Sequence, residues 1–310
     1  MMATTSPAFV WRACWRSARP NFLVLSPLCA GLAVTTAWQD GHAPAGLTIL
    51  LVLLAALLAH AAVNLFNEHH DFVSGLDATT TRTPFSGGSG SLPEHPAAAG
   101  AVRHAAFACL AGVLAIGAWC LWRSGPVMLL YGLLGMALVV AYTGWLTRRP
   151  WLCLAAPGVG FGTLMVVGAN QALTGMFSAT ALAASLVPTL MVSALLLANQ
   201  LPDIEPDRRA GRHHLAIVLG VGRAARLVAG LVLAAFAVVP LAWLGGWLPG
   251  WAWLMWLAAP AALKLAVGLW RLPADVSPGD PAPLVPLLGL NVALLLASLA
   301  LLNLGLWLAA

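Results

Sequence analysis

Apolar residues in this chain come in long runs that short polar stretches separate. A helix needs about 20 predominantly apolar residues to cross the hydrocarbon core of a bilayer. Nine segments fit that length, with approximate limits 21–38, 47–66, 101–122, 126–147, 151–172, 179–201, 224–246, 250–270 and 284–308. The hydrophobic pattern therefore predicts an all-α, polytopic membrane protein with nine transmembrane helices.

The composition agrees with that prediction. Of the 310 residues, 61% are hydrophobic and 8% are charged, whereas a soluble domain has roughly 25% charged residues. A soluble globular protein is excluded. The formal net charge of +5 is too sparse for a nucleic-acid-binding surface on so apolar a chain, so we expect no nucleic-acid partner. The five cysteines show no C-x-x-C spacing and are interpreted as small core residues.

The arginines predict the orientation of the spans. With the N-terminus inside, the inside segments carry Arg12, Arg16, Arg19, Arg82, Arg103, Arg148, Arg149, Arg208, Arg209, Arg212, Arg223, Arg226 and Arg271. The outside loops carry Arg123 alone. This asymmetry fits the positive-inside rule with a cytoplasmic N-terminus, and losing one middle span would destroy it. We therefore expect a multi-pass protein of the inner, cytoplasmic membrane, in direct contact with the lipid bilayer.

Carboxylates gather in two short windows, one after the second predicted span and one after the sixth. Six of the ten acids lie there: Glu68, Asp71 and Asp77, then Asp203, Glu205 and Asp207. Four spans separate the windows, so both emerge on the same side of the membrane. Ordinary solvated loops would scatter their acids, so acids clustered at two helix mouths indicate a functional site.

The two windows also resemble each other in sequence. Asn67 and Asp71 in the first, and Asn199 and Asp203 in the second, share an Asn-x-x-x-Asp spacing at an offset of 132 residues. This similarity suggests a duplicated four-helix unit. We therefore expect a single domain, 1–310, built of two pseudo-repeats at about 21–147 and 151–270 with a final helix at 284–308.

Helical spacing predicts the local form of each window. Asn64, Asn67 or Glu68, and Asp71 follow i, i+3/i+4, i+7, so they share one face of an extended second span. In the second window Pro202 and Pro206 make a continuous helix unlikely to form, because proline lacks the N–H that an interior turn requires. A broken helix end is tolerated at membrane depth where it lines a polar cavity.

Residue chemistry indicates what the site binds. Carboxylate and amide oxygens suit Mg²⁺, which is commonly held by one or two carboxylates together with substrate phosphates. Nearby arginines supply partners for those phosphates; the candidates are Arg82, Arg208, Arg209 and Arg212. The glycine-rich segment 81–91 fits either an anion-binding loop or a flexible one. A diphosphate with a lipid tail matches both the polar site and its apolar surroundings.

Two segments, Asn64–Asp77 and Asn199–Gly220, resemble the two aspartate-rich motifs of the UbiA superfamily of intramembrane prenyltransferases. They most resemble the branch that acts on 1,4-dihydroxy-2-naphthoate in menaquinone synthesis. Arg19-Pro20 and the segments 141–144 and 168–175 are similar to that branch more loosely. The resemblance implies a UbiA-like helical bundle with nine spans and an active site that faces the cytoplasm.

The resemblance also implies a reaction and a set of roles. The reaction is Mg²⁺-dependent transfer of a polyprenyl group from a polyprenyl diphosphate to an aromatic acceptor, a quinone precursor such as 1,4-dihydroxy-2-naphthoate. The expected metal ligands are Asn67, Glu68, Asp71, Asp77, Asp203 and Asp207. The expected substrate-binding residues are Asn64, Asn67, Asn199, Arg82, Arg208, Arg209, Arg212 and Tyr142, and the expected catalytic residues are Asp71, Asp203, Asp207, Arg82 and Arg212.

Two alternatives stay open at this point. One is a different reaction at the same site, such as transfer to a non-aromatic acceptor or terpene cyclisation. The other is a small-solute transporter, since repeated units with broken helices and intramembrane acids are also features of transporters. Open roles include those of Lys264 and of the histidines at the span ends, His69, His70, His213 and His214. For His60, inside span two, we expect a hydrogen bond between helices rather than catalysis.

Overall fold

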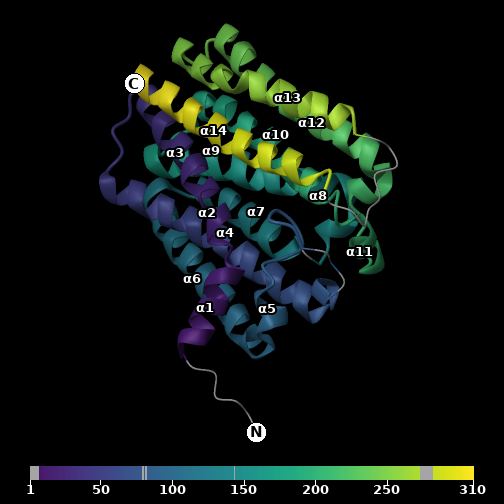
Figure 1. Ribbon diagram of the computed structural model, residues 1–310. Coiled ribbons are helices and arrows are strands. Elements are labelled where there is room, and N and C mark those ends of the chain that lie inside the picture. Colours follow the sequence, from purple (N-terminus) through teal and green to yellow (C-terminus); the bar gives the residue numbers. More distant parts are fainter. Residues whose placement is uncertain (1–6, 79, 81, 143, 273–281) are drawn as a thin grey trace.

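The computed structural model describes residues 7–78, 80, 82–142, 144–272 and 282–310. Within these ranges every regular element is a helix, and the long helices pack side by side as one bundle (Figure 1). Thr81, the first residue of the glycine-rich segment, and Thr143, in one of the looser matches, lie outside the described residues. The fold class predicted from the hydrophobic pattern is confirmed.

The elements follow one another in a simple order. They are α1 (Pro7–Ser17), α2 (Pro20–Leu23), α3 (Leu25–Gln39), α4 (Gly46–Val73), η1 (Leu76–Ala78), α5 (Ser91–Glu94), η2 (Pro96–Ala98), α6 (Ala99–Ser124), α7 (Val127–Ala141), η3 (Leu146–Arg148), α8 (Pro150–Gly158), η4 (Val159–Leu164), α9 (Met165–Thr174), α10 (Ala179–Asn199), α11 (Ile204–Arg209), α12 (Leu215–Leu244), η5 (Gly250–Ala258), α13 (Ala259–Trp270) and α14 (Val285–Ala309).

Eight helices in the described part of the chain are long and apolar enough to cross a membrane. They are Pro20–Gln39, Gly46–Val73, Pro96–Ser124, Pro150–Thr174, Ala179–Asn199, Leu215–Leu244, Gly250–Trp270 and Val285–Ala309. Each coincides with one of the nine predicted segments. The polytopic architecture is therefore confirmed, but the count of nine spans is not.

The remaining segment, predicted at 126–147, forms the shorter helix α7, which has 15 residues and ends at Ala141. The chain then turns, and Leu146 and Thr147 are buried in η3. The carbonyl of Thr147 accepts a hydrogen bond from the backbone N–H of His213, at 2.9 Å. The predicted end of this segment was wrong because its last residues pack against the loop of the second carboxylate window instead of prolonging the helix.

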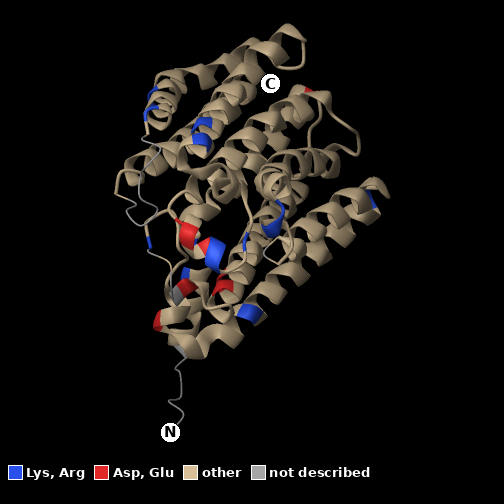
Figure 2. Cartoon of the chain, turned by 90° about the vertical axis from the view of Figure 1, so that its right-hand side faces the viewer, with Lys and Arg blue, Asp and Glu red and all other residues tan. Residues whose placement is uncertain are grey.

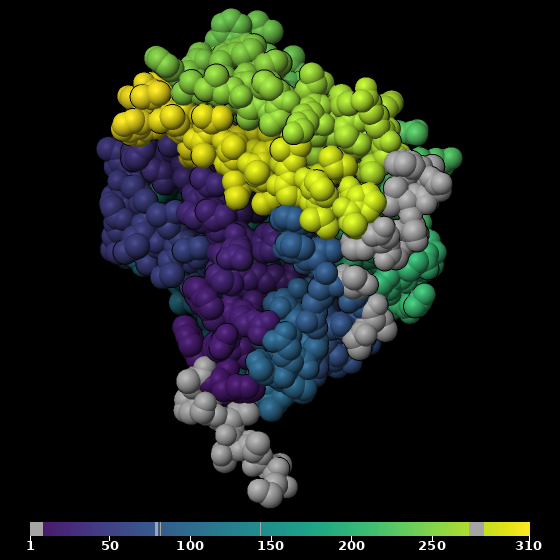
Figure 3. Space-filling model, in the orientation of Figure 1, coloured from purple at the N-terminus to yellow at the C-terminus, as the bar shows by residue number. Residues whose placement is uncertain are grey.

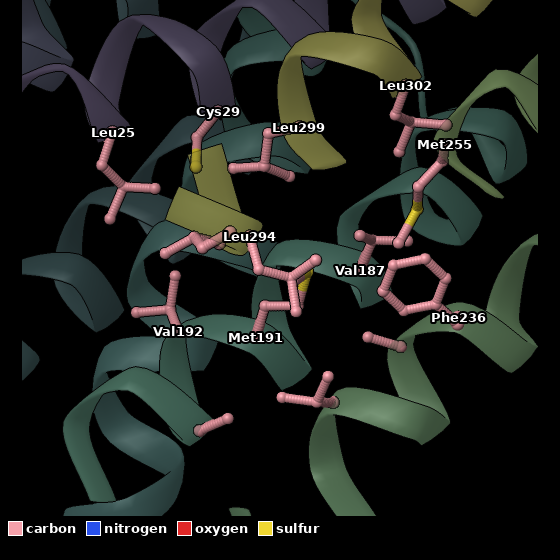
Figure 4. Close-up of a cluster of buried hydrophobic side chains, with 14 of the residues drawn as sticks. Leu25, Cys29, Val187, Met191, Val192, Phe236, Met255, Leu294, Leu299 and Leu302 are labelled. Carbon is pink, nitrogen blue, oxygen red and sulfur yellow. The ribbon is translucent and has the colours of Figure 1, made fainter. Parts of the chain in front are cut away.

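The largest apolar core surrounds α10. Figure 4 shows Val187, Met191 and Val192 of α10 among side chains from α3, α12, η5 and α14. On the outside, α14 lies across the bundle between the N-terminal segment and the α12–α13 region (Figure 3). Many of the buried residues are alanines, and small side chains allow helices in lipid to approach closely. Helix α10 is thus the central element, and its last turn leads into the second window.

One helix contact is close enough to exclude any side chain. Gly158 and Gly162, four residues apart in α8 and η4, face α10, and a Cβ built on Gly162 would overlap the backbone of Thr189. A Cβ on Gly158 would overlap the Thr189 carbonyl oxygen in the same way. This is the small-x-x-x-small packing typical of membrane helices. It fixes the π-helical turn Val159–Leu164, and with it Phe161, against the centre of the bundle.

We expect Gly162→Val to destabilise the protein by about 2 kcal/mol or more, because the new side chain has no space against α10. The matched control is Gly230→Val in α12, where a Cβ meets no atom within 4 Å. Thermal unfolding of the detergent-purified variants measures the effect. Equal stability of the two variants would show that η4 and α10 are not in direct backbone contact.

Candidate active site

The first carboxylate window lies on the last turns of α4, which continues to Val73, well past the predicted span limit of 66. Ser74 caps the end of the helix, and Gly75 takes a φ of 76°, a left-handed conformation that favours glycine. This turn leads into η1, where Asp77 is buried. The predicted extension of the second span is observed, and the turn after it returns Asp77 toward α4.

The second window is a broken helix end, as the two prolines predicted. Helix α10 ends at Asn199, the short helix α11 covers Ile204–Arg209, and α12 begins at Leu215. Gly211, between α11 and α12, has a φ of 78°. The turn after α10 carries Asp203, and α11 carries Asp207.

Both windows face one polar cavity of about 160 Å³. Its walls include Asn67, Asp71 and Asp77 from the first window, Asn199, Asp203, Asp207, Arg212 and His214 from the second, and Arg19, Phe85, Gly87, Gly88 and Tyr142. Figure 2 shows acidic and basic residues close together in the lower part of the bundle, whereas charged residues are sparse over the rest of the helices. Residues about 130 positions apart in the sequence thus form a single site.

Arg212 joins the two windows. Its Nη1 lies 2.9 Å from Oδ1 of Asp207, and its Nη2 donates to Oδ1 of Asp71. Burial works against the charge of this guanidinium, but Asp207 and Asp71 outweigh it and raise the pKa of Arg212 above its usual range. The other oxygen of Asp207 lies 2.8 Å from Nε2 of His214, a fully buried ring. Arg212 therefore holds a carboxylate from each motif in place.

Two further carboxyls lack such a partner. Burial, together with the charge of Asp207, raises the pKa of Asp203 to about 7. Burial, with the charges of Glu68 and Asp71, raises the pKa of Asp77 to about 6. Burial is the larger cause of both shifts and neighbouring carboxylates add to it, so a bound cation would stabilise the ionised form of each group.

Unpaired oxygen atoms mark where a cation fits. Among the described residues, Oδ2 of Asp77, Oδ1 of Asn199 and Oδ1 of Asp203 are sealed from solvent and have no hydrogen-bond partner. The described part of the chain holds no preformed group of three or more His, Cys, Asp or Glu side chains suited to a metal ion. Mg²⁺ does not need one, because it keeps several waters and takes further oxygens from a substrate phosphate. The donor set therefore fits Mg²⁺.

Glu68 was expected among the metal ligands, but it does not line the cavity. Its side chain is fully buried and turned toward the glycine-rich loop. Oε2 accepts the backbone N–H of Ser89 at 3.0 Å, and Oε1 accepts the Ser89 hydroxyl. Nη2 of Arg19 lies 3.4 Å from Oε2. In this structure both carboxylate oxygens anchor the loop.

Three arginines expected at the phosphates also lie elsewhere. Arg82 is at the surface, with Nη1 3.8 Å from Oε1 of Glu94. Arg208 is exposed and pairs with Glu205 at 2.5 Å. Arg209 is exposed on α11. None of the three lines the polar cavity. Arg82 and Arg208 lie next to carboxylates outside the cavity, and Arg209 is exposed to solvent.

The glycine-rich loop forms one wall of the cavity. Gly87, Gly88 and Gly90 have φ values of 80°, 77° and 72°, which only glycine adopts without strain. A Cβ on Gly88 would lie 2.9 Å from Oδ1 of Asp77. The backbone of this loop therefore approaches the carboxylates more closely than a chain with side chains could.

A second, mostly apolar cavity of about 440 Å³ adjoins the first. The two share six lining residues: Arg19, Asn67, Phe85, Tyr142, Leu196 and Asn199. Along α4 its wall runs from Val52 to Asn67, about 22 Å at 1.5 Å per residue. Asn64 lines this cavity, and its Nδ2 donates to the carbonyl of Ala18 at 2.9 Å. A polar site thus opens directly onto a long apolar one.

Arg19 was counted among the inside arginines and in a loose family match but was not expected in the site, yet its side chain lines both cavities. Its Nε is buried without a partner among the described residues. The backbone of Arg19 has a φ of 54°, and the following proline disfavours the α-helical alternative. The Arg-Pro pair was the feature of the sequence that could have identified Arg19 as a site residue. It interrupts the helix just before a span and so places a positive charge at the end of that span.

Comparison with known proteins agrees with this geometry. Residues 24–281 match the model of the UbiA prenyltransferase family. The chain is 28% identical over 260 residues to the 1,4-dihydroxy-2-naphthoate octaprenyltransferase of Bacillus subtilis (strain 168), and the match covers 82% of this chain and 81% of that protein.

Two solved structures show the same fold. One, from work on digeranylgeranylglyceryl phosphate synthase in membranes, has a TM-score of 0.66 at 13% identity and covers 96% of this chain and 99% of its own. The other, a UbiA homologue from Archaeoglobus fulgidus bound to GPP and Mg²⁺, has a TM-score of 0.57 at 16% identity and covers 94% of this chain and 99% of its own.

Proposed function

The chain belongs to the UbiA prenyltransferase family, and from that premise we propose that it transfers a polyprenyl group from an isoprenoid diphosphate to a hydroxylated aromatic ring, a quinone precursor such as 1,4-dihydroxy-2-naphthoate. One observation carries the proposal: the carboxylate-lined cavity shares six lining residues with an apolar cavity whose wall runs about 22 Å along α4. The likeness to the Bacillus subtilis enzyme supports the choice of acceptor.

We assign Mg²⁺ to the cavity-facing oxygens of Asn67, Asp71, Asp77, Asp203 and Asp207, with Asn199 as a further donor. The Archaeoglobus fulgidus homologue binds GPP and Mg²⁺, and the unpaired oxygens of Asp77, Asn199 and Asp203 support the same cofactor here. When bound, Mg²⁺ supplies Lewis-acid neutralisation of the leaving diphosphate. Glu68 keeps the loop in place rather than joining this set.

The chain supplies the remaining contacts to the diphosphate. Arg212 and Arg19 lie on the cavity wall as cations, and guanidinium groups donate readily to phosphate oxygens. The positive-φ backbone at Gly87 and Gly88 leaves room for an anion to approach the loop. These fixed donors stabilise negative charge as it develops on the leaving group.

In the proposed reaction the polar cavity holds the leaving diphosphate, and the apolar cavity holds the prenyl group. The bond between C1 of the prenyl group and the diphosphate oxygen breaks, and its electron pair leaves with the diphosphate. The allylic cation stays on the apolar side, where Phe85, Tyr142 and Leu196 form the boundary and exclude water. A π pair of the acceptor ring forms the new C–C bond, and loss of a proton or of CO₂ restores aromaticity.

The protein is a multi-pass integral membrane protein, and we propose that its active site faces the cytoplasm. The site lies where α4 and α10 end and α3 and α12 begin. Arg12, Arg16 and Arg19 precede α3, and Arg208, Arg209 and Arg212 precede α12. This end of the bundle, which we call the site end, is the one that the positive-inside rule assigns to the cytoplasm. The two four-helix pseudo-repeats stay a prediction.

A non-aromatic acceptor is the second candidate. The solved structure with a TM-score of 0.66 comes from work on a digeranylgeranylglyceryl phosphate synthase, whose name places prenyl groups on a glyceryl phosphate rather than on a ring. Terpene cyclisation would use the same diphosphate site without an acceptor. Membership of a family of prenyltransferases removes the transporter from consideration.

Diphosphate release by the detergent-purified protein tests the proposal. With Mg²⁺ and a panel of prenyl diphosphates, we expect release only when 1,4-dihydroxy-2-naphthoate is present, together with a prenylated product. Release that instead requires a glyceryl phosphate acceptor would select the second candidate. Release without any acceptor would indicate a cyclase or a hydrolase.

A further inference from the structure

A histidine lies in the wall of the apolar cavity, well away from the carboxylates. His60 lines this cavity together with Ala56, Ala59 and Val63 of the same helix. It precedes Asn67 by seven residues, about 10 Å along the helix axis. His60, Asn64 and Asn67 are spaced by four and three residues and so share one face of α4. The polar stripe of the active site therefore continues into the apolar cavity and ends at His60.

One nitrogen of this ring is occupied. Nδ1 of His60 lies 3.0 Å from the hydroxyl oxygen of Ser26 in α3, which is the hydrogen bond between helices that the sequence predicted. Ser26 is fully buried, and its hydroxyl has no other partner in the described part of the chain. We assign the Ser26 hydroxyl as the donor to Nδ1, because its proton then has an acceptor, and this assignment places the ring proton on Nε2.

The other nitrogen is free for a ligand. Among the described residues no group is within hydrogen-bonding distance of Nε2 of His60, and this atom is not one of the polar atoms sealed from open space. The ring packs edge-on against Phe161, with 4.6 Å between centroids. Because Phe161 belongs to the π-turn that is wedged against α10, the imidazole has a rigid support on one side and Ser26 on the other.

An isoprenoid tail cannot satisfy this donor, because it has no hydrogen-bond acceptor. Leaving the N–H against a hydrocarbon chain is unfavourable. An oxygen on a substrate ring is the matching group. The acceptor ring must lie next to C1 of the prenyl group, at the level of Asn64 and Asn67, and a bicyclic ring extends from there toward His60. The ring of Phe161 beside His60 can also pack against an aromatic ring of the substrate.

We propose that Nε2 of His60 donates a hydrogen bond to a ring hydroxyl oxygen of the aromatic acceptor and so positions that ring for attack on C1. This inference rests on the proposed function and deepens it, since it places the acceptor between α4 and the π-turn of η4. No proton or electron pair moves to or from His60. Ser26 acts through His60 and is a positioning residue.

Substitution of His60 separates acceptor binding from donor binding. In His60→Phe, which keeps a ring but loses the donor, the KM for 1,4-dihydroxy-2-naphthoate rises about tenfold, as expected for one lost hydrogen bond, while the KM for the prenyl diphosphate stays unchanged. His60→Gln, which retains an N–H donor, recovers most of the loss. Ser26→Ala raises the acceptor KM less than His60→Phe does.

Analogues that lack one hydroxyl test the contact without relying on a variant. As competitive inhibitors of the wild-type protein, 1-hydroxy-2-naphthoate and 4-hydroxy-2-naphthoate are expected to differ in affinity, because only one of them keeps the oxygen that His60 would contact. In His60→Phe we expect that difference to disappear. The matched control is Asn303→Leu, which removes a hydrogen bond between α14 and the Leu28 carbonyl outside the cavity and leaves both KM values unchanged.

Each result decides a different question. A wild-type protein that prenylates no aromatic acceptor overturns the proposed function and this inference with it. A wild-type protein that does so, with an acceptor KM unchanged in His60→Phe or with equal affinity for both analogues, overturns this inference alone. Parallel rises in the KM values of donor and acceptor would show a structural role for His60 and would also overturn it.

Discussion

Asp203→Asn is expected to lower turnover at least about a hundredfold, as removal of one preorganised electrostatic contact does elsewhere, while the protein remains folded. The asparagine keeps the shape of the side chain and removes its charge. Burial already raises the pKa of Asp203 to about 7, which means that the buried position disfavours the charged form. A neutral asparagine there should therefore not destabilise the protein in the absence of a cation. What is lost is a ligand for the cation that neutralises the diphosphate.

The measurement is single-turnover formation of prenylated product at saturating Mg²⁺, with thermal unfolding as the test of folding. Asp40→Asn serves as the matched control. Asp40 accepts hydrogen bonds from Ser178 and Thr180, at 2.5 Å and 2.7 Å, beyond the end of α3 that lies away from the site. Its replacement should leave turnover unchanged. Turnover of Asp203→Asn near the wild-type rate would remove Asp203 from the metal set.

The same carboxyls give this first prediction a pH signature. The pKa of an unfolded aspartate is about 3.9, and burial raises it to about 6 for Asp77 and about 7 for Asp203. The cation-free fold therefore loses stability as the pH rises from about 4 to about 7. Mg²⁺ restores this stability, and below pH 6 protons compete with it. The Mg²⁺-induced rise in Tm should therefore be larger at pH 8 than at pH 6, and the difference should shrink in Asp203→Asn.

Arg212→Ala is expected to reduce both turnover and stability. The arginine bonds to Asp71 and to Asp207, one from each motif, so its loss leaves two carboxylates without their counter-ion. Removing one partner of a largely buried ion pair costs about 3 kcal/mol. Turnover should fall at least about a hundredfold, because a positive charge facing the diphosphate is also lost.

A double variant distinguishes the two effects. In Arg212→Ala with Asp207→Asn, one of the stranded charges is neutralised, so Tm should recover in part while turnover stays low. Arg212→Lys keeps the charge but not the planar fork that reaches both carboxylates, and it should lie between the wild type and Arg212→Ala in Tm. Wild-type stability of Arg212→Ala would mean that the two motifs are held together by other contacts.

Much of this fold could be predicted because the bilayer imposes a simple length rule on apolar helices. Eight predicted segments are long apolar helices. Asp71, Asp203 and Asp207 meet at one cavity, as the clustering of acids after two spans that end on the same side indicated. The end of the segment at 126–147 was missed because hydropathy does not register a tertiary contact such as that between Thr147 and His213.

The side-chain partners in the site were harder to predict. Sequence proximity placed Glu68, Arg82 and Arg208 beside the carboxylates, but each turns to a nearer partner: Ser89, Glu94 and Glu205. Arg19 is 49 residues from Glu68 and comes within 3.4 Å of it only through the packing of α4. Such pairings depend on tertiary packing, and the spacing of residues within one segment does not predict them.

The short helix α7 has a consequence for the membrane around the site. Its 15 residues extend about 22 Å, less than the roughly 30 Å of a hydrocarbon core. Met128, Tyr131, Gly135, Val139 and Tyr142 line the apolar cavity from this segment, so the mismatch falls on the cavity wall itself. A bilayer thins locally beside a helix that is too short for it. We therefore expect a membrane-bound prenyl substrate to enter the apolar cavity beside α7, where its head group has the shortest distance to travel to the carboxylates.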